Sequence, residues 1–206
     1  MIPTPELFSP EPIRLPQLMF LHTRSAGPGA NNDNLNPEKH LRQISWLMAD
    51  DLGKTWTVCD HNLGDEFSGV PKRNGALANY LHHAIESNGQ LAAILFALHL
   101  DMYRSDVIVA HNMKYHIDAI YRECARLSLP FASPFCPEKT KYIDLKKVGV
   151  DFCHLMGKSG SPKYPSLAEL CKCCLGKEYI SENNTLKDIE IARSCYYHLK
   201  NHGQIK

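Results

Sequence analysis

A histidine and an arginine stand two residues apart near the N-terminus, directly after a short apolar run. The run is Leu18 to Leu21, and His22, Thr23 and Arg24 follow it. We interpret the run as the end of a buried strand that leads into a turn, because Ser25-Ala26-Gly27 come next. Polar side chains at such a strand end are a common place for a functional site, and they are also ordinary edge chemistry.

Two pairs of residues near the C-terminus have the spacing of zinc ligands. Cys171 and Cys174 are three positions apart, as are Cys195 and His198, and zinc sites often draw two ligands from such a pair. Each pair would lie on one face of a helix, where cysteines are more often packed in a core. We therefore predict core packing for these cysteines, with structural zinc as the alternative.

The composition indicates one globular domain. Of 206 residues, 44% are hydrophobic and 22% charged, and 23 Lys and Arg against 22 Asp and Glu give a formal net charge of +1. Any nucleic-acid-binding surface must therefore be a local cluster of basic residues. We expect no membrane span, because the apolar runs are too short, and no secretion signal. Eight cysteines without small-scaffold spacing indicate a cytoplasmic, reducing compartment.

The hydrophobic pattern predicts three strands followed by helices that alternate with two short strands. The predicted strands are 15–21, 41–49, 55–59, 106–110 and 142–145, and the predicted helices are 74–86, 90–103, 114–127, 165–175 and 184–201. This order favours a mixed α/β sheet with helices packed on it. We expect residues 1–16, with five prolines, to form an extended arm, residues 17–206 a single domain, and residues 151–163 a mobile insert.

Three single residues carry further expectations. Asn112 precedes the helix predicted at 114–127, and we expect its side chain to cap that helix. Trp46 and Trp56 fall in the second and third predicted strands, and we expect both to pack within the sheet.

Several blocks of the sequence resemble, in order, those of one nuclease family. The blocks are MFLHTRSAG, LRQISWLMADDLGK, DVIVAHNMKYHIDAIYREC, KYPSLAELCKCCLGKEY and NNTLKDIEIARSCYYHL. Together they resemble the DnaQ-like 3′–5′ exonucleases, the DEDDh group of the ribonuclease H-like fold, over residues 18–200. The resemblance implies a ribonuclease H-like mixed sheet of about five strands.

The resemblance also implies a two-metal site, and this chain departs from the family pattern there. In the family, four carboxylates hold two Mg²⁺ ions and a histidine is the general base. His22 and Arg24 stand at the first two carboxylate positions, His116 at the third and Asn183 at the histidine position, and only Asp188 remains. Two Mg²⁺ ions would lack oxygen ligands, and an asparagine cannot abstract a proton. Two-metal hydrolysis should therefore be absent or very slow, and whether the chain is an enzyme stays open.

Our preferred hypothesis is a degenerate exonuclease homologue that binds nucleic acid or a protein. In a nucleic-acid-binding module, Arg24, Lys114, Lys163 and Tyr164 would contact a single strand of DNA or RNA. A protein partner would instead use an external surface, to which the prolines of residues 1–16 are suited.

The alternative is an enzyme with a rebuilt metal site. His22, His116 and Asp188 would together hold one Zn²⁺ or Mn²⁺ ion, and the chain would be a 3′–5′ exonuclease or another phosphoesterase. Against it, Arg24 would repel a cation. In the simplest arrangement Arg24 pairs with Asp188 and the two histidines are neutral.

Overall fold

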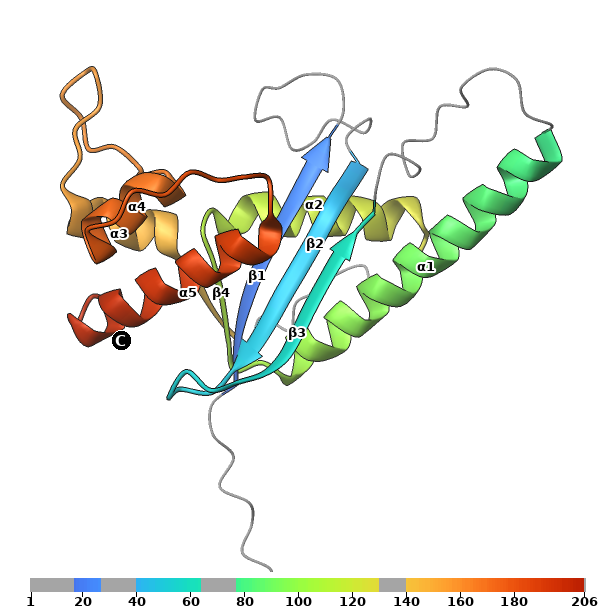
Figure 1. Ribbon diagram of the computed structural model, residues 1–206, viewed down its shortest axis with the longest axis horizontal. Helices are drawn as coiled ribbons and strands as arrows, with labels where there is room; N and C mark the ends of the chain where they lie inside the picture. The colour runs from blue at the N-terminus through green and yellow to red at the C-terminus, as the bar shows by residue number, and fades with distance from the viewer. Residues whose placement is uncertain (1–16, 27–39, 64–76, 130–139, 206) are drawn as a thin grey trace, which may run out of the picture.

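A five-stranded mixed sheet forms the centre of the protein in the computed structural model, which describes residues 17–26, 40–63, 77–129 and 140–205 (Figure 1). The strands, in the order β3-β2-β1-β4-β5, are β1 (Leu18–Ala26), β2 (His40–Ala49), β3 (Thr55–Asn62), β4 (Val107–Ala110) and β5 (Lys141–Asp144). β1, β2 and β3 form an antiparallel meander, and β4 runs parallel to both β1 and β5. The predicted mixed sheet of about five strands is confirmed.

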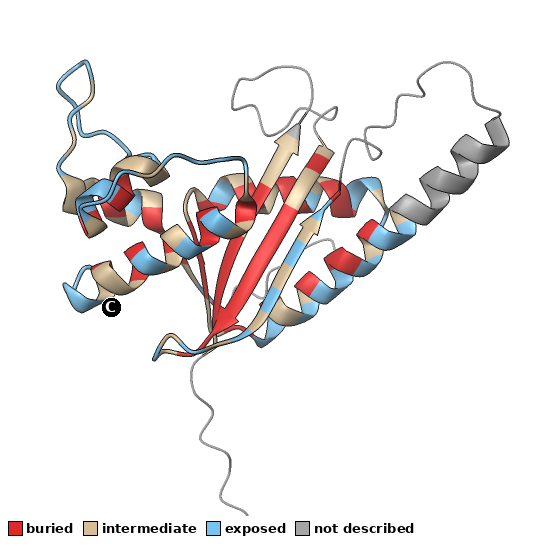
Figure 2. Ribbon diagram, in the orientation of Figure 1, coloured by how far each residue is buried: buried red, intermediate tan, exposed pale blue. Residues whose placement is uncertain are grey.

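Helices cover both faces of the sheet (Figures 1 and 2). α1 (Leu77–Arg104) and α2 (Met113–Arg126) pack on one face, and α3 (Leu145–Cys153), α4 (Leu167–Leu175) and α5 (Thr185–Asn201) pack on the other. β1 supplies both cores, because successive side chains of a strand point to opposite faces: Met19 joins the α1–α2 core and Phe20 joins the core beneath α5. None of the described helices is long and apolar enough to cross a membrane.

β1 extends five residues beyond the predicted strand end at residue 21. His22, Thr23 and Arg24 lie within the strand, where they are paired with Ser45, Ile44 and Gln43 of β2. The predicted strand end at residue 21 is therefore too early, and Ser25 and Ala26, which were expected to begin a turn, also lie in β1, because pairing with the long central strand β2 outweighs the local preference of small residues for a turn. Thr23 points to the α2 side of the sheet, and His22 and Arg24 point to the α5 side.

The helix α1 is continuous through Ser87-Asn88-Gly89, where the sequence predicted a break between two helices. Its buried face, which includes Leu91, Leu95 and Leu98, packs on the sheet directly after this point. Tertiary packing therefore overrides the weak helix propensity of the three residues.

Two glycines in helices should respond oppositely to alanine. A Cβ at Gly89 would meet nothing within 4 Å, so Gly89→Ala should raise the free energy of unfolding by about 0.5–1 kcal/mol. A Cβ at Gly149 in α3 would lie 2.8 Å from Cγ of Pro165 and 2.9 Å from Cδ1 of Leu170. Gly149→Ala should therefore lower the free energy of unfolding by about 1–2 kcal/mol. Urea unfolding of both variants measures the two changes in the free energy of unfolding. Two changes of the same sign would contradict this prediction.

The segment after β5 differs most from its prediction. Residues Leu145–Cys153 form α3, which the sequence analysis missed and which includes the first three residues of the predicted insert. Asp144 caps α3, because its Oδ1 accepts the backbone N–H of Lys146 at 3.0 Å. α4 begins two residues later than predicted, behind a capping box in which Ser166 and Glu169 satisfy each other's backbone N–H groups.

The single-residue expectations have mixed outcomes. Trp46 is fully buried as predicted, whereas Trp56 is 46% exposed because β3 is an edge strand that none of the described helices covers on that side. The side chain of Asn112 makes no capping hydrogen bond, so the predicted cap of α2 is wrong.

Buried cysteines fill the contact between α4 and α5. Cys171, Cys174 and Cys195 belong to the core on that face of the sheet, which confirms the predicted packing. A hydrogen bond with Cys174 and burial both raise the pKa of the Cys195 thiol, so this thiol stays protonated.

Candidate functional site

A polar cleft of about 630 Å³ opens where β1 and β4 reach the same edge of the sheet. The cleft is walled by the first turns of α2, α3, α4 and α5. Its charged and aromatic lining residues are His22, Arg24, His111, Tyr115, His116, Lys146, Lys163, Tyr164, Glu169 and Asp188. The cleft thus brings together most of the residues that the sequence singled out, from segments more than 150 positions apart.

His116 lies at the bottom of the cleft with both ring nitrogens engaged. Its Nδ1 accepts the backbone N–H of Thr23 at 3.0 Å, and its Nε2 lies 3.0 Å from the carbonyl oxygen of His111. A backbone N–H can only donate, so the proton of the neutral ring is on Nε2. Burial, followed by the neighbouring His22, lowers the pKa of His116 well below its ordinary value. His116 is therefore a neutral structural link between β1 and the end of β4.

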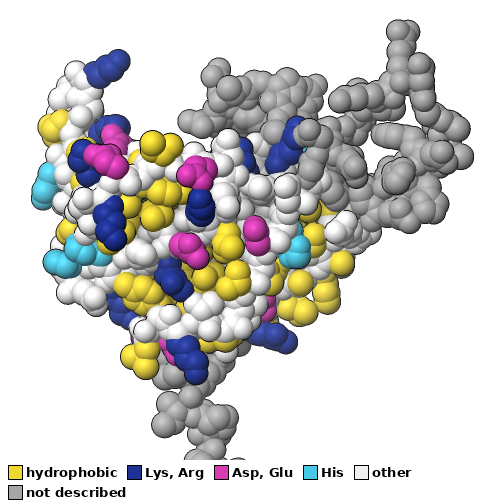
Figure 3. Space-filling view, in the orientation of Figure 1, with side chains coloured by type: hydrophobic (Ala, Val, Ile, Leu, Met, Phe, Trp, Pro, Cys, Tyr) yellow, Lys and Arg dark blue, Asp and Glu magenta, His cyan; other side chains and the backbone are white. Residues whose placement is uncertain are grey.

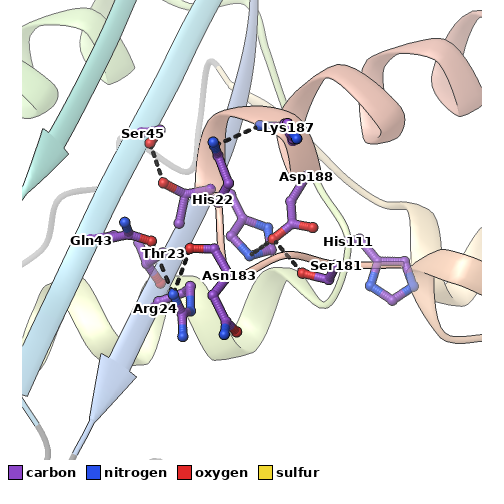
Figure 4. A network of polar contacts seen from close by, with 12 residues as sticks. His22, Thr23, Arg24, Gln43, Ser45, His111, Ser181, Asn183, Lys187 and Asp188 are labelled. Atoms are coloured by element: carbon purple, nitrogen blue, oxygen red, sulfur yellow. Dashed lines mark hydrogen bonds and ion pairs between the residues drawn. The ribbon is translucent and has the colours of Figure 1, made fainter. Parts of the chain in front are cut away.

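His22 is the second neutral imidazole of the cleft. Its ring centroid lies 4.6 Å from that of His116, and its Nε2 lies 3.3 Å from Oδ2 of Asp188 (Figure 4). Burial, with smaller contributions from His111 and Arg24, lowers the pKa of His22 to about 4. At neutral pH the contact with Asp188 is consequently one between a neutral ring and a carboxylate.

Asp188 is buried in the first turn of α5, and other side chains satisfy its carboxylate. Oδ1 accepts the hydroxyl of Tyr179 at 2.6 Å, and Oδ2 accepts the hydroxyl of Ser181 at 3.2 Å. Burial and this carboxylate raise the pKa of Tyr179, so the phenol remains a donor. The sequence analysis missed both hydroxyl residues, although each stands within nine positions of Asp188.

Arg24 points away from Asp188 and toward the loop before α5 (Figure 4). Its Nη1 donates to the carbonyl oxygen of Asn183 at 2.6 Å and to Oε1 of Gln43 at 3.2 Å. The ion pair between Arg24 and Asp188, the simplest of the arrangements considered, therefore does not form. Asn183 adopts a left-handed backbone conformation with φ of 61°, and it contributes its carbonyl group to this contact. Nε and Nη2 of Arg24 have no acceptor among the described residues.

The lysines predicted to contact nucleic acid divide between two places. Lys163 and the 57% exposed Tyr164 line the polar cleft, and Lys163 forms an ion pair with Glu169. Lys114 does not line this cleft, because it lies on another face of α2, where it pairs with Asp118 at 2.6 Å.

Lys146 is a cleft cation that the sequence analysis missed. It lies in the first turn of α3, half-buried, and no described residue forms an ion pair with its ammonium group. Its position follows from the Asp144 cap, so recognising that α3 begins at Leu145 would have indicated Lys146 as a candidate.

The three predicted metal ligands, His22, His116 and Asp188, lie together in the cleft, where their donor atoms make contacts within the protein. His116 has no free nitrogen, and hydroxyl groups occupy both oxygens of Asp188. In the described part of the chain, no three His, Cys, Asp or Glu side chains form a group that could hold a metal.

Solved structures of exonuclease I share this fold. A product-bound structure of exonuclease I has a TM-score of 0.60 and 14% identity, covering 91% of this chain and 44% of that chain. E. coli exonuclease I in complex with a 5cy-dT13 oligonucleotide has a TM-score of 0.60 and 14% identity, covering 92% and 41%. The zinc ion bound form of the E. coli ExoI–ssDNA complex has a TM-score of 0.59 and 12% identity, covering 92% and 41%.

The likeness at this level of identity concerns the fold. No protein-family model and no curated protein matches the chain. The chain spans less than half the length of the exonuclease I structures that it matches. The protein therefore has the ribonuclease H-like α/β fold of exonuclease I, as its sequence blocks predicted.

Proposed function

We propose that the polar cleft binds single-stranded DNA or RNA and does not hydrolyse it by a two-metal mechanism. The observation that carries the proposal is the chemistry at the carboxyl ends of β1 and β4. There the cleft offers Arg24, Lys146 and Lys163 in place of a set of free carboxylates. Such cations attract phosphate groups and repel divalent metal ions.

The cations of the cleft differ in how free they are to bind phosphate. Nη1 of Arg24 is held by Asn183 and Gln43, which orients the guanidinium group and leaves its other donors for a phosphate. Lys146 has no ion-pair partner among the described residues, so phosphate binding costs it no existing contact. Lys163 would have to exchange Glu169 for a phosphate. We therefore assign the main phosphate contacts to Arg24 and Lys146.

An exposed aromatic ring completes a site for a single strand. Tyr164 follows Lys163 and is 57% exposed at the cleft, where a base can stack on its ring. The exonuclease I neighbours were solved with a dT13 oligonucleotide and as an ssDNA complex, which supports the same class of ligand here. His22 and His116 add no positive charge at neutral pH, because their pKa values are lowered.

The proposal predicts salt-dependent binding that requires Lys146. Labelled single-stranded DNA and RNA should bind at low salt, and three phosphate contacts should give a slope of about −2 in a plot of log K against log salt. Lys146→Glu should weaken binding about fivefold and reduce the slope by about 0.7. Fluorescence anisotropy measures both values.

The matched control is Lys54→Glu. Lys54 is exposed at the β2–β3 turn, at the opposite end of the sheet from the cleft, so its substitution makes the same change in net charge. The affinity of the Lys54→Glu protein for the oligonucleotides should stay within about twofold of that of the unsubstituted protein. Absence of binding at low salt, or equal effects of the two substitutions, would reject the proposal.

A further inference from the structure

A second cleft of about 630 Å³ lies beside the polar cleft and has a different lining. Its walls are β5, the first turn of α2 and the start of α3, with Gln204 and Ile205 closing one side. We call it the apolar cleft, because its floor consists of Met113, Ile117, Tyr142, Ile143, Val148 and Ile205. The volume is within the range of about 300–1,000 Å³ that is typical of pockets for organic ligands.

Lysines surround this apolar floor. Lys114, Lys141 and Lys147 line the cleft, and the single carboxylate among its lining residues is Asp144. Oδ1 of Asp144 accepts hydrogen bonds from the backbone N–H groups of Asn112 and Lys146, so this carboxylate already has partners within the protein. Lys147 is exposed and has no ion-pair partner within the described ranges. The apolar cleft therefore suits a ligand that combines apolar surface with negative charge.

The first turns of α2 and α3 line both clefts, and we call these two turns the ridge. In α2, Lys114 lines the apolar cleft and Tyr115 lines the polar cleft. In α3, Lys147 lines the apolar cleft and Lys146 lines the polar cleft. Neighbouring residues of a helix point about 100° apart, so each pair of side chains straddles the ridge. Lys146 and Lys147 thus place one lysine in each cleft, whereas Lys114 is already paired with Asp118.

We infer that a single strand bound in the polar cleft crosses this ridge and places its next bases in the apolar cleft. Lys147 would contact the phosphates of that part of the strand, Lys114 would do so only by exchanging Asp118 for a phosphate, and the apolar floor would cover the faces of the bases. A nucleic-acid strand repeats an apolar base and an anionic phosphate along its length, which matches an apolar floor with a cationic rim. The inference rests on the proposed function, because it extends the same ligand beyond the polar cleft.

The length of the bound strand tests the inference. Anisotropy titrations would compare oligo-dT strands of about 4 and about 12 nucleotides, lengths that span the range covered by single-strand binding sites. Lys147→Glu should weaken binding of the longer strand about fivefold and reduce its salt slope by about 0.7. Binding of the shorter strand should stay within about twofold. Lys54→Glu again serves as the control of equal charge, and both lysines are exposed, so neither substitution disturbs the core.

The possible results separate this inference from the proposed function. If neither strand binds the unsubstituted protein at low salt, both are wrong. If both strands bind and Lys147→Glu changes neither affinity, or changes both equally, the apolar cleft does not hold the strand and the inference alone is wrong. A peptide of alternating acidic and apolar residues provides a further comparison. If this peptide binds the unsubstituted protein but not the Lys147→Glu variant, and the affinity of both oligonucleotides is unchanged by the substitution, the apolar cleft binds a protein partner and the inference is wrong.

Discussion

Arg24→Gln should weaken the binding of single-stranded oligonucleotides by about tenfold or more, which corresponds to about 1.4 kcal/mol or more. Arg24 is the cleft cation whose orientation the protein fixes, through Asn183 and Gln43. A preoriented guanidinium group loses little conformational freedom when it binds a phosphate, and it presents two parallel donors. Its loss should therefore cost more than the loss of the freer Lys146.

The folded state must be checked in the same variant. Arg24 also connects β1 to β2 and to the loop before α5, so Arg24→Gln removes its hydrogen bonds to Gln43 and Asn183 and should lower the free energy of unfolding by about 1–2 kcal/mol. Urea unfolding measures this change, and anisotropy at a temperature where both proteins are folded measures the affinity. An Arg24→Gln protein that binds as tightly as the unsubstituted protein would remove Arg24 from the proposed site.

Acidification from about pH 7 to about pH 4 should lower the free energy of unfolding by roughly 3 kcal/mol through His22 alone. The pKa of His22 falls from 6.5 to about 4 on folding, mainly because the ring is buried. Between these two pH values the unfolded chain binds a proton that the folded protein does not bind, so stability falls as the pH falls. Above pH 6.5 the ring is neutral in both states and contributes no pH dependence. His116 adds to the loss in the same direction.

Urea unfolding at a series of pH values tests this assignment. His22→Gln keeps an N–H donor near Asp188 and has no titratable group, so its stability should fall less on acidification, by up to roughly 3 kcal/mol. The control is His202→Gln, because His202 is exposed just beyond the end of α5. Equal pH dependence of the His22→Gln and unsubstituted proteins would show that His22 is not held neutral by burial.

The strands and most helices were predictable from local pattern, and two of the departures share one kind of cause. The break expected at Ser87-Asn88-Gly89 does not occur, because the buried leucines of α1 continue on one face beyond it. The strand predicted to end at residue 21 continues, and Ser25 and Ala26 do not form the expected turn, because β2 pairs with β1 as far as Ala26. In both places a long-range contact overrides a weak local preference, and a local pattern does not contain that contact.

The residues of the site were predictable, but their roles were not. The sequence blocks correctly brought His22, Arg24, His116 and Asp188 to one cleft. Their roles depend on partners that the spacing does not indicate, such as the hydroxyl of Tyr179 on Asp188 and the carbonyl group of Asn183 on Arg24.

The most direct test of the central claim follows one strand through both binding and cleavage. Single-stranded DNA and RNA with a 5′ label are incubated with the protein in Mg²⁺, Mn²⁺ or Zn²⁺, and each reaction is divided between a native gel and a denaturing gel. We predict a retarded complex on the native gel and a strand of full length on the denaturing gel. Shortening from the 3′ end that disappears in a His22→Ala protein would contradict the account, because it would assign metal-dependent hydrolysis to this cleft.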